Sequence, residues 1–156
     1  ASQEALEADQ RIPVQRLPYF CAGCPHNTGT SIVEGAHVIG GIGCHTLGMF
    51  MEDRGGQTFT QMGCEGANWI GQAPFVETEH AFANVGDGTY VHSAILAIRA
   101  CVAANRNMTY KILYNGAVAM TGGQVNDTKD FSTPPRIAAQ LLAEGVRECV
   151  IVTDDT

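Results

Sequence analysis

The chain has 156 residues, a formal net charge of −7 and 45% hydrophobic residues, which suits one domain with its own core. The acidic balance and the lack of a basic run argue against nucleic acid or an anionic membrane as a partner. No apolar stretch is as long as a membrane span and no secretory signal opens the chain, so we expect a cytoplasmic protein. The sequence does not begin with Met, and we expect it to be a fragment of a larger chain or a processed one.

Apolar runs bounded by glycine and proline predict the order of the elements. Residues 1–18 show no hydrophobic period, and we expect an irregular lead-in before a domain at residues 19–156. We predict strands at residues 36–41, 80–86, 108–115 and 148–154, and helices at residues 65–75, 89–105 and 134–146. Strands that alternate with helices indicate the α/β class, with a parallel sheet flanked by helices on both faces.

The helix at residues 89–105 has the clearest pattern in the chain. Its apolar residues Val91, Ile95, Ile98 and Val102 recur at helical spacing and form a stripe, which Ala94, Ala97 and Cys101 widen. We therefore expect this stripe to be the buried face of the helix.

Two glycine-containing loops directly follow predicted strands. The first is VGDGT at residues 85–89, and the second is YNGAVAMTGGQ at residues 114–124. The carboxyl ends of parallel strands meet at one edge of a sheet, so Asp87 and Asn115 are expected to converge there. Carboxylate and amide oxygens suit Mg²⁺, and the free N–H groups that open a helix suit a diphosphate.

A lone GDG has a simpler interpretation, in which Asp87 only caps the following helix. The second loop, which is expected at the same edge of the sheet, favours instead a binding site for Mg²⁺ and a diphosphate. A dinucleotide-binding domain is the weakest alternative, because the G-x-G-x-x-G spacing is absent.

Six cysteines without a secretory signal indicate reduced thiols, metal ligands or burial. Cys21 and Cys24 form a C-x-x-C motif, and Cys44 follows the first predicted strand. Zinc and iron–sulfur sites use four such ligands, and Cys64 is the one plausible fourth ligand within this chain. A redox or zinc module therefore remains an alternative function, and so does a tight loop that only buries a thiol.

Two of the five histidines adjoin these cysteines at the predicted ligand edge. His26 and His45 are our candidates for catalytic residues. His92, on the helix after GDG, could face the cofactor or pack, whereas His37 and His80 fit structural positions at strand starts.

Longer strings add a resemblance to a known family. YFCAGCPH, QMGCEGANWIGQAPF, GDGTYVHSAILAIR and YKILYNGAVAMTGGQ resemble the 2-oxoacid:ferredoxin oxidoreductases, and most of all their indolepyruvate branch. The resemblance covers nearly the whole chain. It implies the diphosphate half of a thiamine-diphosphate fold, and oxidative decarboxylation of an aryl-2-oxoacid with coenzyme A and ferredoxin. A branch acting on branched-chain or pyruvate-type 2-oxoacids is the alternative.

The resemblance also implies roles for particular residues. The side chains of Asp87 and Asn115 and the backbone of Ala117 would bind Mg²⁺. The cofactor contacts would comprise these three with Gly43, Cys44, Gly86, Gly88, Thr89, Thr121 and Gly122. A [4Fe–4S] cluster in the intact enzyme would use Cys21, Cys24 and Cys44, with its fourth ligand outside this domain. One departure is Gly116, where the family pattern has an acid.

The same resemblance implies that the site is incomplete here. The Glu that activates thiamine diphosphate comes from a separate pyrimidine-binding domain, which this sequence does not resemble. We therefore expect the fragment to be inactive alone, and the intact enzyme to be a homodimer.

Overall fold

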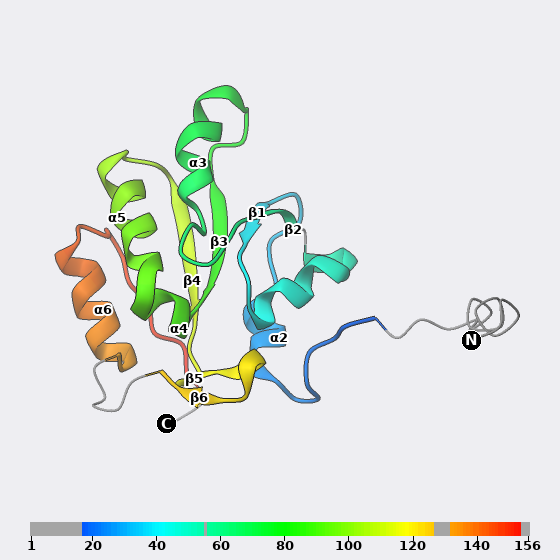
Figure 1. Cartoon of the computed structure of the whole chain (residues 1–156). Helices are drawn as coiled ribbons and strands as arrows, with labels where there is room; N and C mark the ends of the chain where they lie inside the picture. The colour runs from blue at the N-terminus through cyan, green and yellow to red at the C-terminus, as the bar shows by residue number, and fades with distance from the viewer. Residues whose placement is uncertain (1–16, 55, 127–131, 154–156) are drawn as a thin grey trace, which may run out of the picture.

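The computed structural model describes residues 17–54, 56–126 and 132–153, so most of the expected lead-in lies outside the described residues. Its centre is a four-stranded parallel sheet in the order β2-β1-β3-β4 (Figure 1). The strands are β1 (His37–Gly40), β2 (Gly56–Phe59), β3 (Ala81–Gly86) and β4 (Met108–Leu113). Three of them match predicted strands, and the parallel sheet with flanking helices confirms the predicted fold class. Strand β2 was not predicted, because GQTF is short and carries little apolar pattern.

Helices cover both faces of the sheet (Figure 1). One face carries α3 (Ala67–Gln72), the helix that follows β3, and α6 (Pro134–Ala143). The other carries α2 (Pro25–Gly29) and the 3₁₀ helix η1 (Cys44–Phe50). Two further 3₁₀ turns, η2 (Glu52–Arg54) and η3 (Ala73–Phe75), follow η1 and α3. No helix in the described part of the chain is long and apolar enough to cross a membrane.

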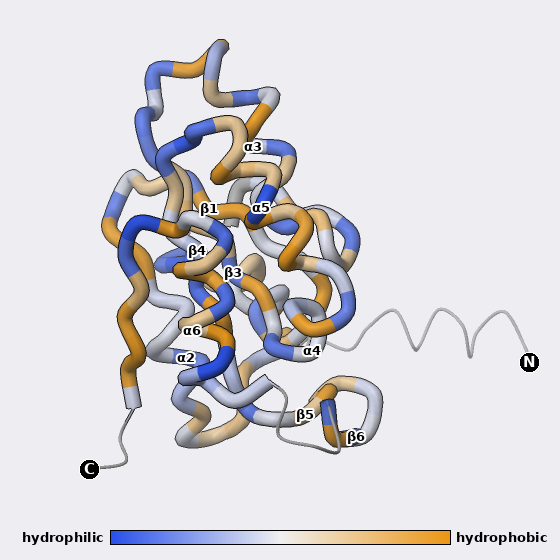
Figure 2. Tube along the Cα trace, turned by 90° about the vertical axis from the view of Figure 1, so that its left-hand side faces the viewer, coloured by the Kyte–Doolittle hydropathy of each residue, from blue (hydrophilic) through white to orange (hydrophobic). Residues whose placement is uncertain are grey.

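The core follows from the alternation of side chains along each strand. Ile39, Ala81 and Ala83 pack with Trp69 of α3. A second cluster joins the helix after β3 to α6 through Tyr90, Ile98, Ile137 and Leu141. Figure 2 shows the resulting hydrophobic stretches through the centre of the molecule. On β3 the intervening Asn84 instead lines a small cavity under η1.

The helix after β3 differs from the prediction in where it begins and in which of its side chains are buried. It begins at Asp87 and consists of α4 (Asp87–Thr89), the π-helical turn η4 (Tyr90–Ala94) and α5 (Ile95–Ala103). The wide π turn rotates the residues before it relative to those after it. The most buried apolar positions are therefore Tyr90, Ala94, Ala97, Ile98 and Cys101, while Val91, Ile95 and Val102 are half-buried.

Two segments in the C-terminal half of the chain differ from the prediction. Residues 148–153 form no strand, and Val150, Ile151 and Val152 stay exposed. A parallel strand needs cover on both faces, and these side chains lack it. In addition, the loop after Asn115 forms an unpredicted hairpin, β5 (Ala117–Val118) and β6 (Gln124–Val125), around the 3₁₀ turn η5 (Ala119–Thr121).

Candidate functional site

The carboxylate of Asp87 joins the ends of β3 and β4. Asp87 is buried, and its Oδ1 accepts a hydrogen bond from the N–H of Gly88 at 2.9 Å. Its Oδ2 accepts from the N–H groups of Asn115 at 3.0 Å and Gly116 at 2.6 Å. The two predicted loops thus meet at the carboxyl edge of the sheet.

The loop after β4 is shaped by Gly116. Its φ of +71° lies in the left-handed region, which a side chain disfavours. In this conformation its N–H donates to Oδ2 of Asp87. Next to it, Asn115 Oδ1 accepts from the N–H of Ala117 at 2.9 Å, so that side chain folds over the start of β5.

The β5–β6 hairpin lies over Gly88, in the first turn of the helix that begins at Asp87. A Cβ at Gly88 would lie 3.0 Å from Asn126 Oδ1 and 3.3 Å from Val118 Cγ2, so glycine is what allows this approach. Both polar side-chain atoms of Asn126 are buried, with no hydrogen-bond partner in the described structure. Sequence reasoning missed Asn126, because nothing in the sequence predicted the hairpin that brings it back.

These groups fit an oxygen-ligated cation with a diphosphate. A carboxylate offers about four lone-pair positions, so the three N–H groups on Asp87 leave room for a metal bond. Asn115 and the carbonyl of Ala117 lie on the same loop end, and the unpartnered Asn126 adds polar atoms beside Gly88. Oxygen donors of this kind are those that Mg²⁺ prefers.

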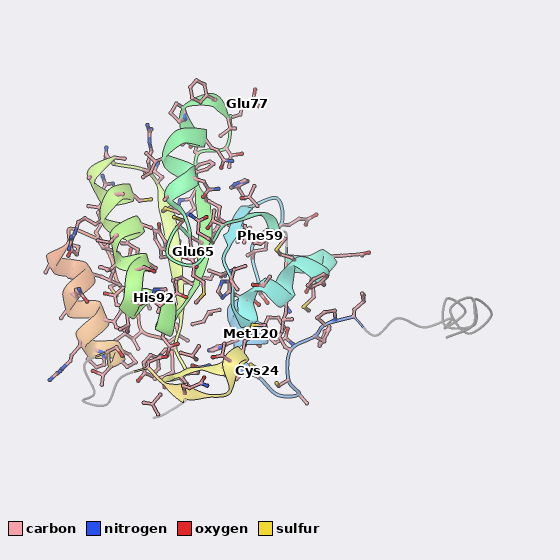
Figure 3. All side chains as sticks on the ribbon, in the orientation of Figure 1. Cys24, Phe59, Glu65, Glu77, His92 and Met120 are labelled. Atoms are coloured by element: carbon pink, nitrogen blue, oxygen red, sulfur yellow. The ribbon has the colours of Figure 1, made fainter. Side chains whose placement is uncertain are left out.

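The other candidate cofactor contacts divide into two groups. Thr89 is buried in the first turn of the helix, and Gly86 precedes it with open space at its Cα. Thr121 and Gly122 are exposed at the tip of the hairpin, where Thr121 Oγ1 donates to Gln124 Oε1 at 2.8 Å. Met120, beside them, is also exposed, and Figure 3 shows it at the same end of the molecule as Cys24.

Helix α2 brings the C-x-x-C motif to this end of the sheet. The N–H of Cys24 donates to the carbonyl of Cys21 at 3.1 Å, which closes a tight turn before the helix. The ring of His26 donates from Nε2 to the carbonyl of Tyr114 at 3.3 Å. His26 therefore lies beside the residue that precedes Asn115.

All three candidate cluster thiols are free. Burial raises the pKa of Cys44, and the neighbouring Cys24 and Cys21 raise it further. The described residues nevertheless contain no group of three or more His, Cys, Asp or Glu side chains arranged to hold a metal ion. The thiols are neighbours but not a formed ligand set. Cys64 lies in another turn, where Gln61 donates to its sulfur at 3.1 Å.

His45 is a buried residue in the first turn of η1, next to the loop that carries Gly43. Burial lowers the pKa of His45 to about 4, with a smaller contribution from His26. A Cβ at Gly43 would lie 2.9 Å from the His45 ring, so the ring packs against the loop backbone. The imidazole is therefore neutral at physiological pH, with one ring nitrogen that can donate a hydrogen bond and one that can accept one.

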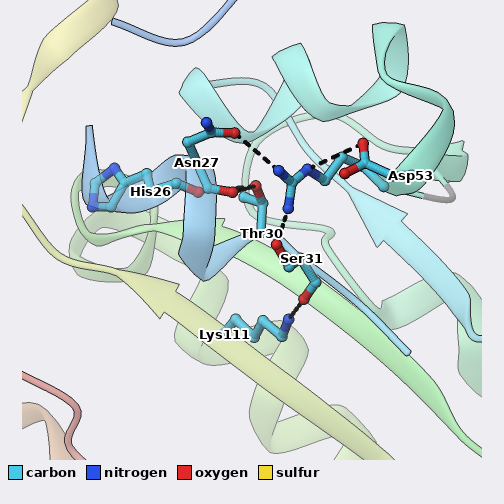
Figure 4. Close-up of polar contacts among 7 residues, drawn as sticks. His26, Asn27, Thr30, Ser31, Asp53 and Lys111 are labelled. Atoms are coloured by element: carbon cyan, nitrogen blue, oxygen red, sulfur yellow. Dashed lines mark hydrogen bonds and ion pairs between the residues drawn. The ribbon is translucent and has the colours of Figure 1, made fainter. Parts of the chain in front are cut away.

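A buried arginine holds α2 in place, which sequence reasoning did not anticipate. Arg54 donates to Asn27 Oδ1 at 3.0 Å and to the hydroxyl of Ser31 (Figure 4). Thr30 Oγ1 donates to the carbonyl of His26 at 2.9 Å, and Lys111 donates to the carbonyl of Ser31. The segment after the C-x-x-C motif is thus attached both to η2 and to β4.

Comparison with known proteins defines the class. Residues 41–154 match the family described as "Thiamine pyrophosphate enzyme, C-terminal TPP binding domain". The match covers most of the chain and includes both loops that meet at Asp87. The chain belongs to this family.

Three curated proteins with similar sequences are subunits of one kind of enzyme. The chain is 28% identical to indolepyruvate oxidoreductase subunit IorA of Thermococcus kodakarensis, over 94% of the chain and 25% of that protein. The IorA proteins of Archaeoglobus fulgidus and Methanothermobacter marburgensis are also 28% identical, over 74% and 78% of the chain and 20% and 21% of their own lengths. The chain thus spans a quarter or less of these relatives. No solved structure matches it significantly.

Proposed function

We propose that this chain is the thiamine-diphosphate and Mg²⁺ binding domain of an indolepyruvate:ferredoxin oxidoreductase. The observation that carries the proposal is the convergence of two loops on the buried carboxylate of Asp87. Three relatives that are indolepyruvate oxidoreductase subunits support the indolepyruvate oxidoreductase assignment.

In this proposal each loop has a defined task. Asp87 and Asn115 ligate Mg²⁺ through side-chain oxygens, and Ala117 does so through its carbonyl. Gly86, Gly88 and Thr89 offer the opening of the helix to the diphosphate, as helix N-termini do for anions. The same surface includes Gly43, Cys44, Thr121 and Gly122. When bound, thiamine diphosphate supplies the carbanion chemistry of oxidative decarboxylation.

The two histidines complete the proposed site. His26, hydrogen-bonded beside Asn115, orients a substrate or diphosphate oxygen. His45 acts as a neutral hydrogen-bonding group, because burial keeps its pKa at about 4.

The remaining components belong to the intact enzyme. Cys21, Cys24 and Cys44 contribute three ligands of a [4Fe–4S] cluster there, with the fourth outside this domain. A pyrimidine-binding domain supplies the activating Glu, and the enzyme forms a homodimer that uses coenzyme A, a 2-oxoacid and ferredoxin. The isolated chain, which lacks these components, is inactive.

Titration calorimetry with thiamine diphosphate and Mg²⁺ tests the binding role. The wild-type chain should bind only when both are present, and Asp87→Ala should abolish binding. Glu77→Ala, at an exposed glutamate far from this edge, is the matched control and should bind normally. Stoichiometric zinc together with no response to thiamine diphosphate would contradict the proposal and favour a zinc module.

The substrate preference is tested separately, by measuring the activity of the full-length enzyme on a panel of 2-oxoacids.

A further inference from the structure

Glu65 is a fully buried carboxyl group that the proposed site does not use. It lies in the turn between β2 and α3 and is 0% exposed. Its Oε2 accepts a hydrogen bond from the N–H of Gly63 at 2.8 Å. Its Oε1 is buried without a partner in the described structure. Figure 3 shows Glu65 above the end of the molecule that carries Cys24 and Met120.

The hydrogen-bonding partners of Glu65 in the described structure, Gly63 and Tyr110, are uncharged. Tyr110 of β4 donates its hydroxyl to the backbone carbonyl of Glu65 at 2.8 Å, and Cys101 of α5 lies behind that hydroxyl at 3.4 Å. On η4, Ser93 packs against Gly63 and is hydrogen-bonded to His92 at 2.6 Å. Burial accordingly raises the pKa of Glu65.

The free oxygen of Glu65 faces Gly41. A Cβ at Gly41 would lie 2.1 Å from Oε1 and 2.4 Å from Cγ of Glu65, so only glycine fits against this carboxyl. Gly41 begins the loop that follows β1. The hydroxyl of Thr46 donates to the carbonyl of Gly41 at 2.6 Å and accepts from the N–H of Gly43 at 3.0 Å. The carboxyl of Glu65 therefore supports the loop that carries Gly43 and Cys44.

An apolar side chain of the same size would fill this space without the cost of burying a polar group that lacks a partner. A buried acid next to a binding edge is therefore more readily explained by a role in that site than by packing.

We propose that Glu65 is a positioning residue of the cofactor site. Its carboxyl group holds the loop at residues 41–44 against the carboxyl end of β1, and Oε1 is the hydrogen-bonding group that fixes this loop when a ligand binds. The identity of that ligand, thiamine diphosphate with Mg²⁺, rests on the proposed function. The support of the loop itself does not.

The experiment compares Glu65→Met, which keeps the size and removes the polar atoms, with Glu65→Gln, which keeps the shape and an oxygen acceptor for the Gly63 N–H. Amide hydrogen exchange at Gly43 reports on the loop, and calorimetry reports on binding of thiamine diphosphate with Mg²⁺. In E65M we expect Gly43 to exchange about tenfold faster and the ligand to bind about tenfold more weakly, the scale of one hydrogen bond. In E65Q both values should stay within about threefold of the wild type.

Tyr110→Phe is the matched control, because it removes the hydrogen bond to the Glu65 backbone and leaves the carboxyl in place. It should leave Gly43 exchange unchanged. If E65M does not fold, Glu65→Asp replaces it, since aspartate keeps the acid but withdraws it from Gly41; the same loss is expected. Unchanged Gly43 exchange in E65M, or an E65Q no better than E65M, would overturn the proposal. Failure of the full-length enzyme to bind the ligand would instead count against the proposed function, and the exchange measurement would still decide the role of Glu65.

Discussion

Asp87 Oδ2 accepts the backbone N–H of Asn115 at 3.0 Å, across 28 residues of sequence. The other oxygen of the same carboxylate accepts the N–H of Gly88, at the start of the helix that Asp87 begins. Gly86 is the N-cap of this helix, and no side chain caps it, so the bonds of Asp87 agree with the two-loop interpretation of GDG and not with the helix-capping one. One carboxylate fixes the start of a helix and the loop opposite it.

Removing this carboxylate should destabilise the chain as well as weaken binding. Asp87→Ala leaves three N–H groups without their acceptor near a buried position, and we expect a loss of at least about 2 kcal/mol in the free energy of unfolding. Urea denaturation measures this loss. Glu77→Ala, at an exposed position, should change the free energy by less than about 0.5 kcal/mol. Equal stability of the wild type and D87A would show that the carboxylate does not join the loops in solution.

The buried His45 predicts a specific sensitivity to acid. Its folded pKa of about 4 lies below the ordinary value of 6.5, so the unfolded chain binds a proton that the folded chain rejects. Stability should be retained above about pH 6.5 and should fall by up to about 3 kcal/mol as the pH drops toward 4. Urea midpoints at a series of pH values should show a smaller fall for His45→Gln than for the wild type. Parallel pH profiles for the two chains would contradict the burial of a neutral imidazole.

Gly41 and Glu65 should be energetically coupled, because a Cβ at Gly41 would overlap the carboxyl group. Gly41→Ala in the wild type should cost about 1–3 kcal/mol, as overpacking does. In a Glu65→Ala background, the same substitution enters vacated space and should cost at least about 1 kcal/mol less. A double-mutant cycle from urea denaturation measures the difference. Additive effects would mean that the two residues do not touch in solution.

Arg54 should matter for the C-x-x-C segment, although it lies 30 residues further along the chain. Arg54→Met removes the donors to Asn27 and Ser31, and we expect a loss of about 2 kcal/mol and faster alkylation of Cys24. The matched control is Asp53→Ala, which removes only the exposed partner of Arg54 at 3.5 Å and should cost less than about 1 kcal/mol. Mass spectrometry after thiol labelling measures the alkylation rate of Cys24. An unchanged Cys24 labelling rate in R54M would show that α2 is held by other contacts.

Sequence predicted the parts of the fold that are encoded by local pattern. Apolar runs identified β1, β3 and β4, and the shared carboxyl edge of parallel strands brought Asp87 to Asn115. The parts that it missed depend on distant contacts. Nothing near Asn126 in sequence indicates that it returns to Gly88, and Arg54 reaches Asn27 only once η2 has folded beside α2.

Two further errors came from applying regular geometry to irregular segments. The stripe from Val91 to Val102 assumed an uninterrupted α-helix, whereas the π turn at η4 changes its phase. The run at residues 148–153 has the composition of a strand but lacks cover on both faces. Periodicity indicates which residues prefer burial, and it does not show whether a neighbour exists to bury them.

The missing fifth strand has a consequence for handling the chain. Strand β4 ends the sheet in the described part of the molecule, so one row of its backbone N–H and C=O groups has no neighbouring strand. Val150, Ile151 and Val152 lie exposed in the segment that follows α6. An open edge and an exposed β-branched run are together the usual ingredients of edge-to-edge aggregation. Concentrated solutions should therefore lose material to self-association, and a lysine in place of Val152 should act as a gatekeeper that keeps the chain dispersed.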